Sequence, residues 1–115
     1  MHELSIALSI IEGAESEALR QGSGRVAAVH LKLGPLSGVV REALTFAYDL
    51  ACEGTALEGS RLMVEETPLL IFCSACNAER APVSTQCFRC SVCGAAEGRV
   101  VRGAELELVA LELET

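Results

Sequence analysis

Four cysteines in two Cys-x2-Cys pairs constrain this chain more than any other feature. Cys73 and Cys76 form the first pair, thirteen residues follow, and Cys90 and Cys93 form the second pair. Two thiolates separated by two residues can reach one ion from a tight turn, and two such pairs complete a tetrahedral site. Gly94 suits the positive φ that such a turn often requires. A closed site of four thiolates is typical of a structural metal, so it predicts a fold element more directly than an activity.

Cysteine spacing alone does not decide which metal is bound or which cysteine is the partner of Cys90. Zinc is the first choice, and iron in a rubredoxin-like centre is the alternative, because tetrahedral sulfur geometry alone does not separate them. Cys87 lies three residues before Cys90, so Cys87 and Cys90 can also form the second pair. We favour Cys90 and Cys93 because Gly94 follows them, which leaves Cys87 as a substitute. Cys52 lies on an expected helix and is predicted to be a small buried apolar residue.

Composition and charge limit the number of domains and the classes of partner that this chain can have. The chain has 115 residues, half of them hydrophobic, with three Phe, one Tyr and no Trp. This length fits one domain with a small insert. A formal charge of −7 argues against nucleic acid or an anionic membrane as partner, because both require clustered Lys and Arg. No basic region precedes the apolar residues 4–11, so we expect no signal peptide, and leaderless metal-binding cysteines indicate a reducing cytoplasm.

Hydrophobic periodicity predicts two helices and three long strands. The helices are expected at residues 3–21 and 38–52, the second capped by Ser37, and the strands at residues 25–33, 61–67 and 104–114. The alternation of the last strand changes phase near Leu108 and Val109, which predicts a β-bulge or a bend. The fold class is α+β: a three-stranded sheet with two helices on one face and an inserted zinc-ribbon-like module with four cysteines. The domains are predicted at 1–69 plus 101–115 and at 70–100.

Specific side chains should carry this packing. The apolar stripe of the first helix is predicted to contain Leu4, Ala7, Leu8, Ile11, Ala14 and Ala18. The stripe of the second is predicted to contain Val40, Ala43, Leu44, Ala47 and Ala51. The inserted module is poor in apolar residues, with Phe72, Val83, Phe88 and Val92 too few to form a stable core alone, so its folding should depend on metal.

The first three residues offer a second set of metal ligands. The free amine of Met1, the amide nitrogen of residue 2 and Nδ1 of His2 can form fused chelate rings, a nitrogen set that suits Ni(II) or Cu(II) in square-planar geometry. The alternative is a solvated histidine at a frayed terminus, which is the commoner outcome for spacing alone. Glu3 can support the first helical turn, serve as a ligand, or act as a partner to His2.

These features together resemble the HypA/HybF family of hydrogenase maturation factors. The resemblance rests on Met1-His2-Glu3-Leu4-Ser5, Leu33-Gly34-Pro35-Leu36-Ser37, Glu42-Ala43-Leu44 with Phe46, and the two cysteine pairs. It spans essentially the whole chain. What it implies is a small nickel metallochaperone that binds nickel through Met1, His2 and Glu3 and zinc through the four paired cysteines. It further implies the GTPase HypB and the large subunit of [NiFe]-hydrogenase as partners, with urease served in some organisms.

One departure from the family matters for the nickel site. Some members carry an acidic residue near position 40, where this chain has Val40, and Glu42 is the nearest carboxylate. We therefore assign no side-chain oxygen ligand from that region. The expected protein is a cytoplasmic carrier, monomeric or weakly dimeric. It is not expected to be an enzyme, because the sequence has no phosphate loop, no plausible triad and no open zinc position. The alternatives are a zinc-ribbon interaction module and a rubredoxin-like iron protein without a nickel role.

Overall fold

The computed structural model describes residues 2–96 and 98–114, apart from the side chain of His2. The chain divides into two compact units. The α/β unit consists of Met1–Lys32, Val39–Glu65 and Glu107–Thr115, and the cysteine unit consists of Leu33–Gly38 and Glu66–Leu106. The predicted division into two domains, with boundaries at residues 69/70 and 100/101, stays a prediction.

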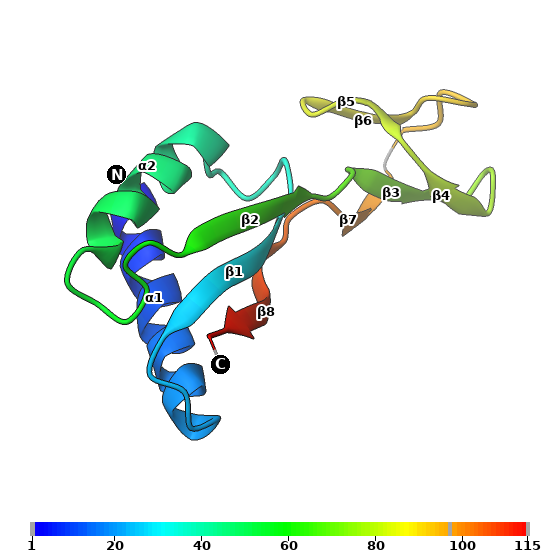
Figure 1. Ribbon diagram of the computed structural model, residues 1–115. Coiled ribbons are helices and arrows are strands. Elements are labelled where there is room, and N and C mark those ends of the chain that lie inside the picture. Colours follow the sequence, from blue (N-terminus) through cyan, green and yellow to red (C-terminus); the bar gives the residue numbers. More distant parts are fainter. Residues whose placement is uncertain (1, 97, 115) are drawn as a thin grey trace. The chain divides into compact units, whose positions relative to one another are not determined.

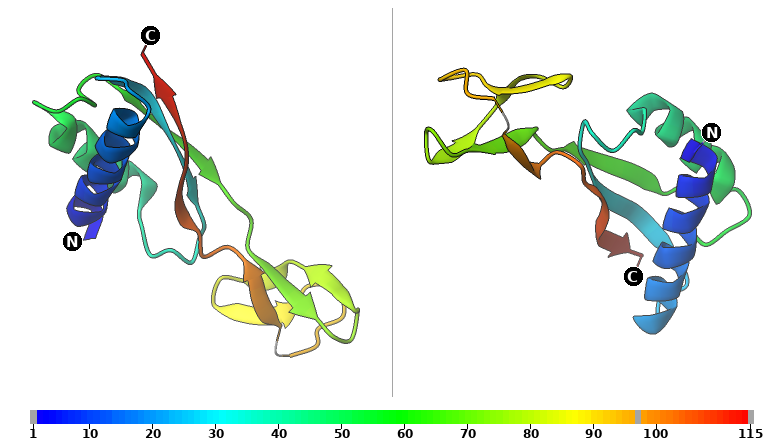
Figure 2. Two further views of the ribbon diagram at one scale, coloured as in Figure 1. Left: turned by 90° about the horizontal axis from the view of Figure 1, so that it is seen from below. Right: turned by 180° about the vertical axis from the view of Figure 1, so that it is seen from behind.

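The α/β unit is a three-stranded sheet with two helices on one face, as Figures 1 and 2 show. Its elements are α1 (His2–Arg20), β1 (Val26–Leu33), α2 (Arg41–Cys52), β2 (Arg61–Glu66) and β8 (Leu106–Leu113). The strand order is β2-β1-β8, so β1 is central and β8 forms one edge. The predicted fold class is confirmed.

Helix α1 packs through a stripe that differs from the predicted one. Ala7, Ile11, Ala14 and Ala18 are buried as expected, but Leu4 and Leu8 are each 52% exposed and Ile10 is buried instead. The prediction for Leu4 and Leu8 is therefore wrong, because the helix is rotated so that Ile10 packs into the core instead. The helix ends at Arg20, one residue before the predicted end, and Gly22 follows with a φ of 79° that allows Ser23 N–H to donate to the carbonyl of Ala18 at 2.9 Å.

Helix α2 begins three residues later than the sequence suggests. Its N-cap is Val40, with φ −87° and ψ 119°, so the prediction of Ser37 as cap is wrong. The backbone N–H of Val40 donates instead to Oε2 of Glu3 on α1, at 3.3 Å. A carboxylate at a helix start satisfies an orphan donor and meets the positive end of the dipole. The sequence pattern missed this cap because its partner lies 37 positions away.

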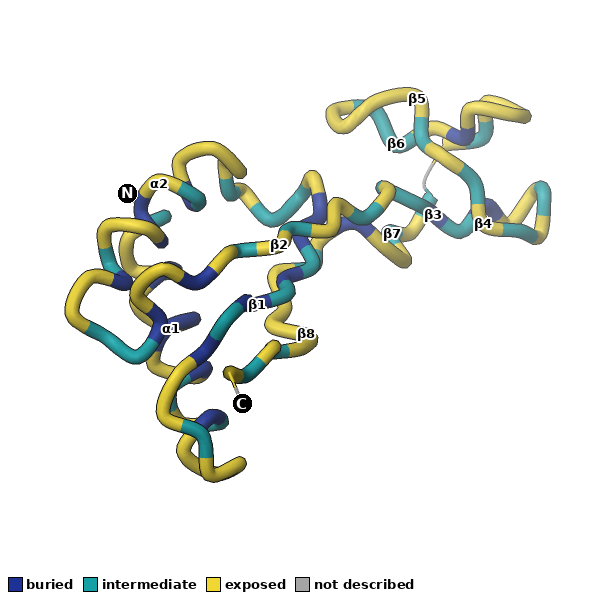
Figure 3. Tube along the Cα trace, in the orientation of Figure 1, coloured by how far each residue is buried: buried dark blue, intermediate teal, exposed yellow. Residues whose placement is uncertain are grey.

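The buried face of α2 also differs from prediction. Leu44 and Ala47 are buried as predicted, but Val40 and Ala43 are exposed, so the prediction for those two is wrong. Tyr48 is fully buried instead. Figure 3 shows the buried residues of the unit concentrated on α1, α2 and β1. The Tyr48 hydroxyl shares a 2.6 Å hydrogen bond with the hydroxyl of buried Ser60. Cys52 is buried beside them, which confirms its predicted role as a small core residue.

The predicted phase change of the last strand is present in the packing. Leu108 lies against α1 near Gly13, and Leu111, three residues later, packs against the core. In a regular strand, side chains on one face are an even number of residues apart, so this odd spacing marks a change of phase. The central strand changes phase as well, because Val26 and Val29 both belong to the core. Core contacts three residues apart thus occur in both neighbouring strands.

The cysteine unit contains two small sheets. One sheet has the order β4-β3-β7, and the other pairs β5 with β6. Its strands are β3 (Leu70–Cys73), β4 (Ala78–Arg80), β5 (Pro82–Ser84), β6 (Cys87–Cys90) and β7 (Arg99–Arg102). Ile71, at the centre of the first sheet, is fully buried, whereas Val83 and Val92 are 60% and 67% exposed. Among its described residues, the buried hydrophobic side chains of the unit are Leu33, Ile71, Cys73 and Cys90, so its apolar core is small.

The loop at residues 33–38 is fastened to the segment that follows β7. Gly34 N–H donates to the carbonyl of Glu105 at 2.8 Å, and Leu36 N–H donates to the carbonyl of Gly103 at 2.7 Å. A Cβ on Gly34 would lie against the Gly103 carbonyl, well inside van der Waals contact. Only glycine permits this close backbone approach, which gives Gly34 a structural role.

The described residues contain no helix with both the length and the apolar character needed to cross a bilayer.

Candidate metal centre

The two cysteine pairs meet at one point of the cysteine unit. Cys73 ends β3 and Cys90 ends β6, and each begins a tight turn that returns the second cysteine of its pair. The Sγ atoms of Cys73 and Cys93 are 3.5 Å apart, and those of Cys76 and Cys90 are 3.9 Å apart. All four Sγ atoms lie within 4.8 Å of one another.

These separations fit a tetrahedral metal site. Four sulfurs at about 2.3 Å from a central zinc would be about 3.8 Å apart, close to the separations observed here. A disulfide requires a sulfur separation of about 2.05 Å, and all six cysteines are free. The arrangement therefore fits one tetrahedral ion held by four thiolates, with no position left open for a substrate.

Backbone donors prepare the thiolates for a cation. The N–H groups of Cys93 and Val92 donate to Sγ of Cys90 at 3.5 and 3.4 Å, and they lower the pKa of Cys90 to about 6. The N–H of Ala95 lowers the pKa of Cys93, but the neighbouring thiols of Cys73 and Cys76 outweigh it and raise that pKa to about 12. Four thiolates this close repel one another, so a cation is what permits all of them to ionise.

A residue with positive φ follows each cysteine pair. Gly94, after Cys93, has φ 74°, as the sequence predicts. Asn77, after Cys76, has φ 53° and is the one non-glycine residue with positive φ among the described positions. Sequence reasoning missed the role of Asn77, although asparagine tolerates this conformation better than most residues. The two turns therefore share one backbone feature, a residue with positive φ directly after the second cysteine of each pair.

Cys87 lies outside the four-sulfur group. It begins β6, where it pairs with Ser84 of β5, whereas Cys90 ends the same strand at the cluster. The structure thus gathers Cys73, Cys76, Cys90 and Cys93, and their assignment as ligands stays a prediction. Cys52 is buried in the α/β unit and belongs to its apolar core.

The predicted nickel ligands lie mainly outside the described residues. Met1 and the side chain of His2 are not described. The backbone at His2 begins α1, and the carboxylate of Glu3 accepts a hydrogen bond from the backbone N–H of Val40, the N-cap residue of α2. The other histidine, His30, has a 2.6 Å contact between its Nε2 atom and a carboxylate oxygen of Glu112 on β8.

Comparison with known proteins gives one consistent family. Residues 1–113 match the family described as "HypA: Hydrogenase/urease nickel incorporation, metallochaperone". The chain is 54% identical to a hydrogenase maturation factor HypA of Roseiflexus sp. (strain RS-1), over 99% of this chain and 93% of that protein. It is 49% identical to the HypA of Chloroflexus aurantiacus (strain ATCC 29366 / DSM 635 / J-10-fl), over 97% and 98% of the two chains.

A solved structure has the same fold. The solution structure of the Ni metallochaperone HypA from Helicobacter pylori aligns with a TM-score of 0.67 and 21% identity, covering 98% of this chain and 97% of that one. At this level of identity the likeness concerns the fold alone.

Proposed function

This chain belongs to the HypA family of metallochaperones for nickel incorporation into hydrogenase and urease, and from that premise we propose that it carries Ni(II) at its N-terminus. The proposed ligands are the amine of Met1, the amide nitrogen and Nδ1 of His2, and an oxygen of Glu3. The acceptor would be the large subunit of [NiFe]-hydrogenase, with urease as a second possibility and the GTPase HypB as assisting partner. The protein would act in the cytoplasm as a monomer or weak dimer.

The observation that best supports this site is the helical backbone at His2. The first four N–H groups of a helix have no intrahelical partner, so the amide of residue 2 is not used in the helical ladder. The positive end of the helix dipole also favours loss of an amide proton, while it opposes a tightly held cation. Those two effects suit a site that forms at neutral pH and releases its ion to a partner.

Glu3 would hold the start of the chain in position. Its hydrogen bond to Val40 joins the first turn of α1 to the beginning of α2. A carboxylate fixed there places negative charge next to His2 and partly offsets the helix dipole. Because its position is fixed by the backbone of residue 40, the side chain of residue 40 need not be acidic in this protein.

The nickel proposal can be tested by measuring nickel affinity on untagged protein by calorimetry. We expect nickel affinity to fall in His2→Ala and in a version with extra N-terminal residues. The fall should exceed the roughly 10–100-fold loss that is typical when a residue hydrogen-bonded to a metal ligand is removed. His30→Ala is the matched control and should bind nickel as the native chain does. Affinity should also fall as pH falls, because the imidazole and the amine must be unprotonated to bind. Undiminished affinity in both His2→Ala and the extended version would exclude the N-terminal site.

We further propose that the four-cysteine cluster holds a structural Zn(II). Zinc supplies a closed tetrahedral crosslink there, and the four thiolates described above would hold it. Elemental analysis should find one zinc per chain in the native protein and in Cys87→Ser, but none in Cys73→Ser. A chain that loses its metal on Cys87→Ser would instead place Cys87 in the site. A coloured iron centre in the absorption spectrum would support the rubredoxin-like alternative.

A further inference from the structure

The edge strand β8 leaves an apolar surface without a partner strand. Among the described residues it is paired on one side only, with β1. Leu106, Leu108 and Val109 are 38%, 39% and 46% exposed. Sheet edges are normally protected by charged inward-facing residues, proline or short length, and an eight-residue edge with exposed Leu and Val is a template for strand addition.

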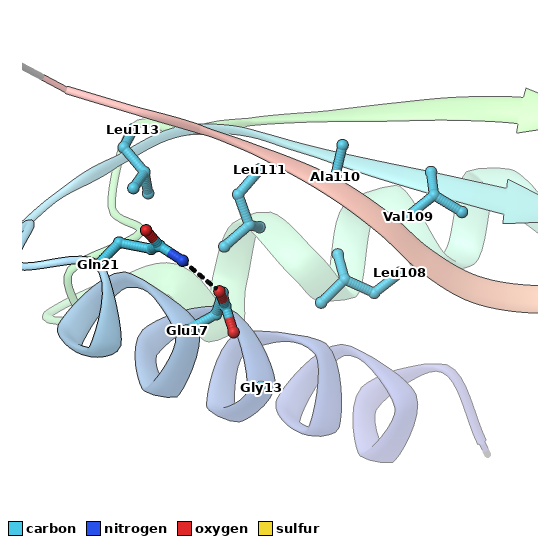
Figure 4. A pocket seen from close by; sticks show the side chains of 8 residues that line it. All are labelled: Gly13, Glu17, Gln21, Leu108, Val109, Ala110, Leu111 and Leu113. Atoms are coloured by element: carbon cyan, nitrogen blue, oxygen red, sulfur yellow. Dashed lines mark hydrogen bonds between the residues drawn. The ribbon is translucent and has the colours of Figure 1, made fainter.

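A cleft of about 490 Å³ lies beside this edge, between β8 and α1 (Figure 4). Its lining residues are Gly13, Glu17 and Gln21 of α1 and Leu108, Val109, Ala110, Leu111 and Leu113 of β8. Gly13 places no side chain in the cleft, and a Cβ added there would be in van der Waals contact with Leu108, at 3.9 Å. Gln21 donates to Glu17 at 2.9 Å and closes one end of the cleft.

The opposite face of β8 is acidic. Because Leu108, Leu111 and Leu113 point toward α1, the intervening glutamates at 107, 112 and 114 lie on the other face. Glu112 contacts His30, and Glu114 has a 3.9 Å contact with Arg25, whereas Glu107 has neither a hydrogen bond nor an ion pair within residues 2–96 and 98–114. The α/β unit has twelve acidic and five basic residues, so it carries the whole formal charge of −7, and the cysteine unit has four of each.

This charge pattern disfavours a second copy of the chain as the partner. If two β8 strands paired antiparallel with full overlap, Glu107 of one copy would lie directly opposite Glu112 of the other, twice in each dimer. Like charges directly opposite each other destabilise a strand pair. A strand that carries basic residues at those positions would meet attraction instead.

We propose that β8 and the adjacent cleft form a docking site for an extended segment of a basic partner protein. The segment adds as a fourth strand to the β8 edge. Its alternate apolar side chains enter the cleft beside α1, and its intervening Lys or Arg side chains face Glu107, Glu112 and Glu114. Main-chain hydrogen bonds supply affinity in this mode of recognition, and the alternating side chains supply specificity. The site contains none of the proposed nickel or zinc ligands, so it is independent of metal binding.

A labelled peptide of alternating lysine and valine, nine residues long with blocked ends, can test the proposal by fluorescence anisotropy on the metal-loaded chain. A second peptide carries N-methyl groups on alternate residues, which keeps all charges but removes the pairing N–H groups. A third peptide has glutamate in place of lysine. We expect binding of the first peptide only. Equal binding of the N-methylated peptide would show attraction by charge alone and would overturn the strand-addition proposal.

Variants of the chain locate the site. Gly13→Leu fills the cleft and should weaken peptide binding at least ten-fold, whereas Ser16→Leu places the same side chain on α1 outside the cleft lining and should not. Glu107→Gln should weaken binding about two- to five-fold, as expected for one exposed ion pair. Glu65→Gln on β2 is its control.

Equal losses in Gly13→Leu and Ser16→Leu would place the peptide elsewhere. A dimer in sedimentation equilibrium that Gly13→Leu dissociates would assign the edge to a second copy, contrary to the proposal.

Discussion

Replacing Gly34 with alanine should destabilise the chain by about 2–6 kcal/mol. The added Cβ would overlap the carbonyl of Gly103, and both groups belong to backbone that cannot rotate away. Forcing a methyl group into closed space costs about 1–3 kcal/mol. Separating the two segments also weakens the hydrogen bonds from Gly34 to Glu105 and from Leu36 to Gly103, at about 0.5–1.5 kcal/mol each.

Two nearby glycines provide matched controls. Gly38 lies in the same loop with φ 79° and open space around its Cβ position, so Gly38→Ala tests the cost of backbone conformation without a collision. Gly24 has open space and ordinary φ, so Gly24→Ala tests neither. We expect a cost of about 1 kcal/mol for Gly38→Ala and no loss for Gly24→Ala.

Thermal unfolding of the zinc-loaded protein measures the difference. For a domain of this size 1 kcal/mol corresponds to about 4–8 °C, so Gly34→Ala should lower Tm by at least about 8 °C. Hydrogen exchange should at the same time become faster at the amides of Gly34 and Leu36. A Tm for Gly34→Ala within about 2 °C of the Gly24→Ala value would refute the close approach between residues 34 and 103.

Two further predictions concern hydrogen bonds. Tyr48→Phe and Ser60→Ala should each lower the free energy of unfolding in urea by about 1–3 kcal/mol. The first variant leaves the Ser60 hydroxyl without its hydrogen-bond partner, and the second does the same to the Tyr48 hydroxyl. The double variant should cost about 1 kcal/mol less than the sum, and strictly additive losses would mean that the two hydroxyls do not interact. The carboxylate of Glu105 accepts hydrogen bonds from Thr67 Oγ1 at 2.7 Å and Gly103 N–H at 2.9 Å, and the first of these chiefly lowers its pKa. A lowered pKa in the folded chain stabilises it above the ordinary value of 4.5, and this contribution is lost as pH falls below that value. Exchange protection of the Gly103 amide should therefore fall with pH in the native chain, and the Glu105→Gln variant should lack this pH-dependent change; an identical pH profile in both would contradict the assignment.

Local pattern was sufficient to predict the two helices, the three long strands and a cysteine cluster. Period-3.6 and period-2 spacing predicted both helices and all three long strands, and Gly94 was correctly expected at positive φ. Spacing grouped the cysteines into pairs but left Cys87 as an alternative to Cys93, and the glycine after Cys93 favoured the four cysteines that the structure brings together. The change of phase in β8 was also visible in the alternation of Leu108 and Leu111. These features depend on residues close together in the chain.

The sequence alone could not supply contacts between distant residues. The rotation of α1 that exposes Leu4 and Leu8 depends on how the helix meets the sheet, which a single helical stripe does not specify. The true cap of α2 comes from Glu3, 37 positions before Val40, so a search for a local cap chose Ser37 instead.

For the motif containing Gly34 and for the edge strand β8, the sequence identified the feature, and only the tertiary structure showed its role. Sequence identified the motif as a mark of family resemblance, but only the tertiary structure shows that the glycine lets two backbones approach closely at Gly103. Likewise, alternation identified β8 as a strand, whereas its place at the sheet edge beside a cleft is a property of topology. Short-range sterics and periodicity are encoded along the chain, and long-range packing is decided only when the elements meet.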